Sequence, residues 1–136
     1  MELVEAVRNY GEEKSWRKVF NAIIDARGSG VLERTVSFAE LLENVIPTNH
    51  KSRIHPATRT FQGIRIAVNA ELDSLEEALP VAFDKLKENG VLVVISFHSL
   101  EDRIVKRFFK RMAGKPEHAA DYTVQQDRVS RANILT

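Results

Sequence analysis

The sequence predicts a mainly α-helical domain followed by a small piece of an α/β domain. Two observations support this prediction. Apolar residues recur at the spacing of amphipathic helices from the N-terminus to Lys87. Residues 91–97, VLVVISF, then form a run that is apolar except for Ser96, which is typical of a strand buried on both faces of a parallel sheet. One strand followed by one amphipathic helix is too little for a sheet, so we expect only a fragment of the α/β domain.

Four helices are expected before this strand. Apolar stripes and the Gly and Pro residues that follow them predict helices over residues 1–9, from Trp16 to Gly28, from Thr35 or Ser37 to Pro47, and from Thr58 to Lys87. Ser37 and Glu40 have the spacing of a capping box at the start of the third helix. Pro80 should break or restart the fourth helix, because proline removes a backbone hydrogen bond from a helix interior.

A polar turn follows the predicted strand. Ser96 and His98 lie at its carboxyl end, which is where the ligand crevice of a parallel sheet is found. We expect Ser99 to cap a helix over residues 100–112, with Asp102 as the other half of a capping box. Capping does not account for Ser96 or His98, which are therefore candidate catalytic residues. A last strand is expected to begin in the segment NILT at the end of the chain.

Length and composition indicate one ordinary globular core. The chain has 136 residues, of which 43% are hydrophobic and 29% are charged. No apolar stretch reaches the roughly 20 residues of a membrane span, and the N-terminus lacks the features of a secretion signal. The absence of cysteine excludes disulfides and thiolate chemistry. We therefore expect a cytoplasmic protein without membrane association.

Several other kinds of site are not indicated. Ser96, His98 and Asp102 follow one another too closely for a hydrolase triad, whose members come from separate loops, and no G-x-S-x-G elbow is present. The loop histidines His50 and His55, like His98, lack the i, i+4 spacing of a zinc-binding helix, so we expect no metal site. The six glycines form neither a G-x-G-x-x-G loop nor a P-loop, so the chain has no recognisable cofactor cradle.

Basic residues are concentrated in two parts of the chain. No acidic residue occurs from Asn44 to Ala70, a window that contains Lys51, Arg53, His55, Arg59 and Arg65. A second cluster consists of Arg103, Lys106, Arg107, Lys110, Arg111 and Lys115. Two cationic patches suggest a polyanionic partner. A solvated helix face, on which basic residues complement the helix dipole, would account for the second cluster equally well.

Two segments resemble a bacterial methyltransferase family of the MraW type. They are SRIHPATRTFQGIRIAVNAELDSLEEAL at residues 52–79 and VISFHSLEDRIVKRFF at residues 94–109. RNYGEEK at residues 8–14 and the terminal NILT are similar to the same family, so the resemblance extends over nearly the whole chain. Gly63 stands where the family usually has Ala, and ENG replaces the family's usual Gly pair before the strand.

The resemblance implies an S-adenosylmethionine-dependent enzyme that methylates the N4 amine of a cytosine in 16S ribosomal RNA of the small ribosomal subunit. Residues 1–82 would form its helical insert domain, and residues 83–136 an incomplete C-terminal portion of its Rossmann-like domain. The cofactor would be bound by an N-terminal half that precedes these residues. This chain alone is then expected to be inactive, and the unpaired edges of its strand should favour self-association.

The candidate RNA contacts are the basic residues Lys51, Arg53, His55, Arg59, Arg65 and Arg103. The alternative is a non-catalytic helical module that binds RNA or a ribosomal partner, for which the same basic segment would suffice.

Overall fold

The computed structural model describes residues 3–47, 54–118, 122 and 128–135. The chain forms two compact units, Met1–Ala70 and Glu71–Thr136. The described residues are mainly helical, and no strand occurs among them. In these parts of the chain, no helix has the length and apolar character needed to cross a membrane.

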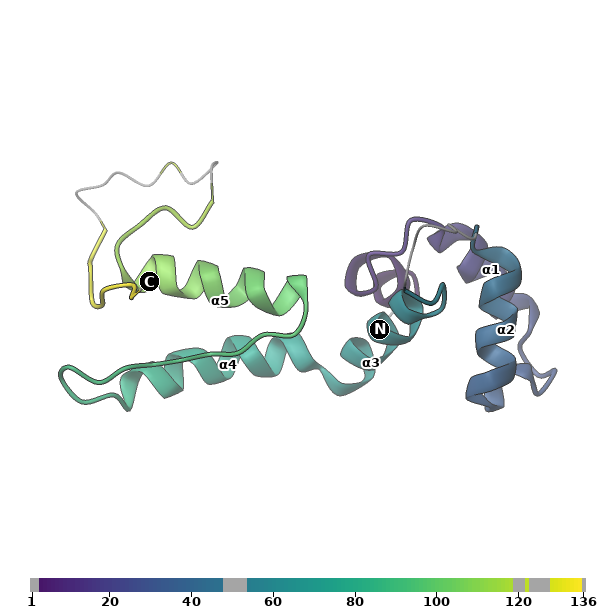
Figure 1. Cartoon of the computed structure of the whole chain (residues 1–136), viewed down its shortest axis with the longest axis horizontal. Helices are drawn as coiled ribbons and strands as arrows, with labels where there is room; N and C mark the ends of the chain where they lie inside the picture. The colour runs from purple at the N-terminus through teal and green to yellow at the C-terminus, as the bar shows by residue number, and fades with distance from the viewer. Residues whose placement is uncertain (1–2, 48–53, 119–121, 123–127, 136) are drawn as a thin grey trace. The chain divides into compact units, whose positions relative to one another are not determined.

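The described residues of the first unit form five helical segments. In chain order they are the π-helix η1 (Glu5–Tyr10), α1 (Trp16–Asp25), the 3-10 turn η2 (Val31–Glu33), α2 (Thr35–Val45) and α3 (Thr58–Asn69) (Figure 1). Apart from η2, which was not predicted, these segments follow the order that the apolar spacing predicts, and Gly11 follows the first of them as expected. Gly28 and Gly30 both have positive φ in the turn after α1, which explains why glycine occurs twice there.

The core of the first unit lies among η1, α1 and α2. Its buried members are Val7, Val19, Ile23, Leu42, Ile46 and Ala57, and Phe38 and Phe61 pack against them in an edge-to-face pair with centroids 5.1 Å apart. The backbones of η1 and α3 also approach closely. A Cβ atom built on Gly63 would lie 2.1 Å from the carbonyl oxygen of Ala6, so packing this close in this chain depends on Gly63.

The predicted capping box of α2 is wrong. Ser37 lies inside the first turn of the helix, and Arg34, in extended conformation, occupies the N-cap position without a side-chain cap. The Ser37 hydroxyl donates instead to the carbonyl oxygens of Val31, at 2.7 Å, and Arg34, at 3.1 Å. The side chain therefore joins α2 to the preceding turn η2, an interaction that spacing within one helix does not reveal.

The predicted long helix from Thr58 is divided at Ala70 and not at Pro80. Ala70 adopts the left-handed conformation with φ 49°, which ends α3, and α4 (Glu71–Asp84) begins at the next residue. Pro80 lies inside α4. Leu75, Leu79 and Phe83, on both sides of this proline, all belong to one apolar cluster. Their common packing offsets the local cost of proline, about 3 kcal/mol in a helix interior.

The second unit is built from α4, a returning segment and α5 (Ser99–Met112). Figure 1 shows the chain after α4 running back along that helix before α5 begins, so that α4 and α5 are parallel. The buried residues Leu79, Val105 and Phe108 form the core. Phe83 of α4 meets Phe108 of α5 edge to face, with centroids 5.9 Å apart.

Residues 91–97 do not form the predicted strand buried on both faces. Exposure alternates along them: Leu92 and Val94 pack on the core of this unit, whereas Val93 and Ile95 are each 78% exposed and Phe97 is 91% exposed. The described residues contain no neighbouring strand that could pair with this segment or cover its outer side. The predicted terminal strand is also absent from residues 133–135, and only an isolated bridge joins Ala113 to Ser130.

Candidate functional site

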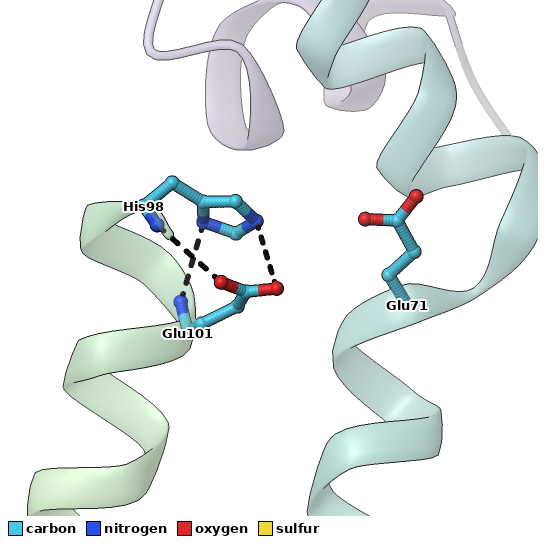
Figure 2. A group of neighbouring side chains, drawn as sticks. All are labelled: Glu71, His98 and Glu101. Atoms are coloured by element: carbon cyan, nitrogen blue, oxygen red, sulfur yellow. Dashed lines mark hydrogen bonds and ion pairs between the residues drawn. The ribbon is translucent and has the colours of Figure 1, made fainter. Parts of the chain in front are cut away.

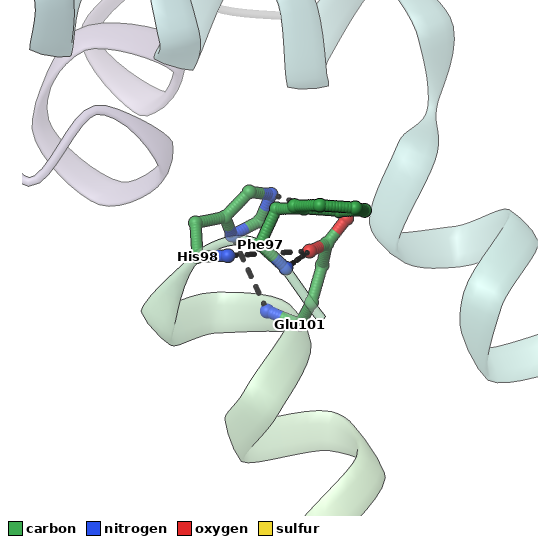
Figure 3. Close-up of polar contacts among 3 residues, drawn as sticks. All are labelled: Phe97, His98 and Glu101. Carbon is green, nitrogen blue, oxygen red and sulfur yellow. Dashed lines mark hydrogen bonds and ion pairs between the residues drawn. The ribbon is translucent and has the colours of Figure 1, made fainter. Parts of the chain in front are cut away.

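The turn before α5 is closed by a capping box made from His98 and Glu101. His98 is the N-cap residue in extended conformation, and its Nδ1 accepts a hydrogen bond from the backbone N–H of Glu101 at 3.4 Å. In return, Oε2 of Glu101 accepts from the backbone N–H groups of Phe97, at 2.8 Å, and His98, at 3.3 Å (Figure 3). The carboxylate is thus fixed by two donors at the positive end of the helix dipole.

The predicted cap of Ser99 with Asp102 is therefore wrong by one residue. Ser99 is the first residue of α5, and the Asp102 carboxylate pairs with Lys106 one turn later, at 2.8 Å. Serine is a more common N-cap than histidine, which explains the prediction. The longer side chain of glutamate at the third position reaches back to two N–H groups, and this places the helix start at His98.

His98, Glu101 and Glu71 form a polar cluster at the N-terminal ends of α4 and α5. One ligand atom from each side chain lies within 4.8 Å of the other two. Figure 2 shows the carboxylate of Glu71 on α4 facing the imidazole ring and the carboxylate of Glu101 across a short gap. We call these three residues the Glu71 cluster. Parallel helices bring both helix starts to the same end of the unit, and this is why residues so far apart in the sequence meet.

One nitrogen of the Glu71 cluster is buried without a hydrogen-bond partner. The His98 side chain is only 10% exposed, and its Nε2 makes no hydrogen bond within the described residues. Nε2 lies 3.4 Å from Oε1 of Glu101, close enough for an ion pair but not aligned as a hydrogen bond. Buried polar atoms are nearly always paired, so an unpaired one is often explained by function or by a group that binds there.

The two candidate catalytic residues have different surroundings. His98 belongs to the Glu71 cluster, whereas Ser96 is half-buried in the returning segment, two residues earlier. Glu71, the third member, was not predicted from the sequence. Its only sequence signal was an acidic residue in the middle of a predicted long helix, and the break at Ala70 that makes it a helix start was not foreseen.

The basic loop, residues 49–59, is described only from residue 54 onward, so Lys51, Arg53 and His50 lie outside the described residues. Within the described part, His55 connects the loop to α2. Its Nε2 lies 2.7 Å from Oε1 of Glu43, and its Nδ1 accepts from the backbone N–H of Ala57 at 3.2 Å. Glu43, the residue immediately before the segment without acidic residues, therefore pairs with His55. Arg59 and Arg65 are exposed on α3.

The second basic cluster is partly neutralised by acids of its own unit. Lys106 pairs with Asp102, and Arg111 lies 3.5 Å from a carboxylate oxygen of Glu117. Arg103 is exposed on the first turns of α5. These pairs support the interpretation of this cluster as a solvated helix face.

A family model and individual known proteins similar to this chain indicate the same family. All residues, 1–136, match the model of the MraW methylase family. Three similar relatives are each named "Ribosomal RNA small subunit methyltransferase H". The protein from Acidithiobacillus ferrooxidans is 46% identical over 98% of this chain and 39% of its own length. The protein from Xylella fastidiosa is 53% identical over 85% of this chain and 38% of its own length. The protein from Geobacter sulfurreducens is 50% identical over 82% of this chain and 36% of its own length. The chain thus spans about two fifths of the length of these relatives.

Proposed function

This chain belongs to the MraW methylase family, and from that premise we propose that it is part of an enzyme that methylates RNA of the small ribosomal subunit. The observation that carries the proposal is the match of residues 1–136 to the family, together with 46–53% identity to relatives named for this activity. The proposed substrate is the N4 amine of a cytosine in 16S ribosomal RNA, and the proposed methyl donor is S-adenosylmethionine.

The donor is assigned to the part of the longer enzyme that this chain does not span. The described residues contain no strand followed by a glycine-rich turn, and the positive-φ glycines lie in turns after helices and at the end of α5. These residues do not fit a cofactor cradle. What this chain would supply is RNA binding and the positioning of the base.

We assign residues 1–82 to a helical insert domain and residues 83–136 to the last part of a Rossmann-like domain. This boundary refers to domains of the longer enzyme and differs from the boundary between the two compact units, which follows Ala70. The exposed side of the segment 91–97 supports the assignment. Its outward residues Val93, Ile95 and Phe97 are the kind that neighbouring strands of a parallel sheet would cover.

Positioning is the main requirement of the proposed reaction. The lone pair of the cytosine amine is delocalised into the ring, so the amine is a weak nucleophile that must be held in line with the methyl group. Arg53, Arg59 and their basic neighbours would hold the RNA backbone through phosphate contacts. Ser96 and His98, at the end of the returning segment, are our candidates for contact with the target base.

The experiment uses the longer enzyme and small-subunit ribosomal RNA. Changing Arg53 and Arg59 together to Ala should weaken RNA binding and reduce the slope of binding against salt, because fewer counterions are released. A matched control removes two exposed arginines of the same unit outside the basic loop, Arg27 and Arg34, and should leave the slope unchanged. Equal slopes for both double variants would remove the proposed role of the loop.

A methylation assay separates the enzyme from the alternative, a non-catalytic module that binds RNA or a ribosomal partner. The longer protein should transfer a labelled methyl group to a cytosine of small-subunit RNA. RNA binding without transfer, under conditions in which a characterised relative is active, would favour the binding module.

A further inference from the structure

We propose that the Glu71 cluster binds a divalent transition-metal ion of the zinc class. This proposal does not rest on the proposed function, although it uses His98, which is also our candidate for contact with the target base, and it concerns only residues of the second unit. The ligands would be Nε2 of His98 and one carboxylate oxygen each from Glu71 and Glu101, whose ligand atoms all lie within 4.8 Å of one another.

The geometry of two of the three ligands already fits. Two ligand atoms held about 2.1 Å from one tetrahedral zinc ion lie about 3.4 Å apart. The distance from His98 Nε2 to Glu101 Oε1 is 3.4 Å. A carboxylate oxygen of Glu71 lies within 4.8 Å of both atoms, so an approach of at most about 1.4 Å, within the reach of side-chain rotation, brings it to the spacing of a shared zinc ion. Figure 2 shows its carboxylate turned toward the other two side chains.

Burial and hydrogen bonding leave Nε2 of His98 and Oε1 of Glu101 available to bind a metal ion. The His98 ring is nine-tenths buried, and Nε2, the nitrogen that faces the carboxylates, is the one without a hydrogen bond. The backbone N–H groups of Phe97 and His98 both donate to Oε2 of Glu101, so Oε1 remains for a metal. The hydrogen bonds to Oε2 orient the ligand carboxylate, as outer contacts do in known metal sites.

The charge of the ligand set suits a divalent cation, because the carboxylates of Glu71 and Glu101 would together balance its two positive charges. The imidazole nitrogen favours a zinc-like ion over magnesium or calcium, which prefer oxygen ligands only. Three protein ligands would leave one tetrahedral position for water or another small ligand.

Metal binding has a consequence for the capping box. Because Nδ1 accepts from the N–H of Glu101, the ring proton of neutral His98 lies on Nε2 in the metal-free state. A metal at Nε2 requires this proton to be on Nδ1 instead, and the long 3.4 Å bond from the Glu101 N–H is then lost. The two bonds to Oε2 continue to hold the helix start.

The test is a titration of this chain with Zn²⁺, monitored both by calorimetry and by NMR of the histidine ring nitrogens. We expect one Zn²⁺ per chain, a change of the protonated nitrogen of His98 from Nε2 to Nδ1, and a shift of the Glu101 amide. Mg²⁺ at the same concentration should produce none of these changes. An unchanged His98 tautomer at saturating Zn²⁺ would overturn the proposal.

Two variants remove one ligand each without removing the helix cap. His98→Asn keeps a favourable N-cap side chain but no imidazole, and Glu71→Gln keeps the shape of the side chain without its charge. Each should weaken Zn²⁺ binding at least tenfold. Glu77→Gln, on the exposed side of the same helix, and His55→Asn, at the other histidine–glutamate pair, are the controls. If His55→Asn abolishes binding while His98→Asn and Glu71→Gln do not, the Glu71 cluster is not the site.

Discussion

Replacing His98 by Ala removes one half of the capping box at the start of α5. The contacts that this substitution removes determine how much the free energy of unfolding should fall. The substitution removes a side chain that is only 10% exposed, and it leaves the backbone N–H of Glu101 without its acceptor. Oε2 of Glu101 keeps its two backbone donors. Loss of an N-cap costs about 1 kcal/mol, and the lost packing of a buried ring brings the expected total to about 1–2 kcal/mol. For a unit of this size, each kcal/mol lowers the melting temperature by about 4–8 °C.

Two neighbouring variants make this prediction specific. Ser99→Ala should change the free energy of unfolding by less than about 0.5 kcal/mol, because Ser99 is an exposed first-turn residue and not the cap. His98→Asn should recover most of the stability lost in His98→Ala, because asparagine is among the best N-cap residues.

The assay is chemical denaturation followed by circular dichroism, with hydrogen exchange at the amide of Glu101 as a local probe. His98→Ala should speed exchange at this amide, and Ser99→Ala should not. If Ser99→Ala proves as costly as His98→Ala, the helix begins one residue later than the structure shows, and the capping argument fails.

Three further predictions concern the chain as a whole. Calorimetric titration of the isolated chain with S-adenosylmethionine should give no heat of binding, because residues 1–136 contain no cofactor loop; measurable affinity would contradict our assignment of the cofactor to the rest of the enzyme. Sedimentation should show self-association that is reduced by replacing Val93 and Phe97 together with Ser, since both side chains are exposed; a monomer before and after the change would show that the outward side of the segment does not associate. Gly63→Val should destabilise the first unit by more than about 2 kcal/mol in denaturant unfolding, because its Cβ has no room beside Ala6; Val68→Ala, at an exposed position of the same helix, is the control and should be nearly neutral.

Helix content could be predicted from the sequence because apolar spacing depends on local periodicity. The helix over Ser99–Met112 is an example, since Leu100, Ile104, Val105 and Phe108 repeat along one side. The break at Ala70 could not be predicted in this way. Alanine favours helices, and its left-handed conformation here contradicts its local preference.

The strand prediction for residues 91–97 failed for a different reason. A continuous apolar run shows that a segment is suited to burial but not that partners are present within the chain. In this structure only the side with Leu92 and Val94 is packed. The candidate site was predicted in part: His98 was found from its place after the apolar run. Glu71 was not found, because its proximity depends on two helices running in parallel.

The contact between η1 and α3 joins the two ends of the first unit in sequence. Gly63 lies against Ala6 and Gly11, while α1 and α2 occupy the chain between them. At a synthesis rate of about 5–20 residues per second, several seconds therefore pass between the synthesis of η1 and that of its partner helix α3. The helices in between can form locally during this interval, but the unit closes only when α3 arrives. We expect late steps of folding to depend on this closure, and early segments to be the ones most exposed to proteolysis in an unfinished chain.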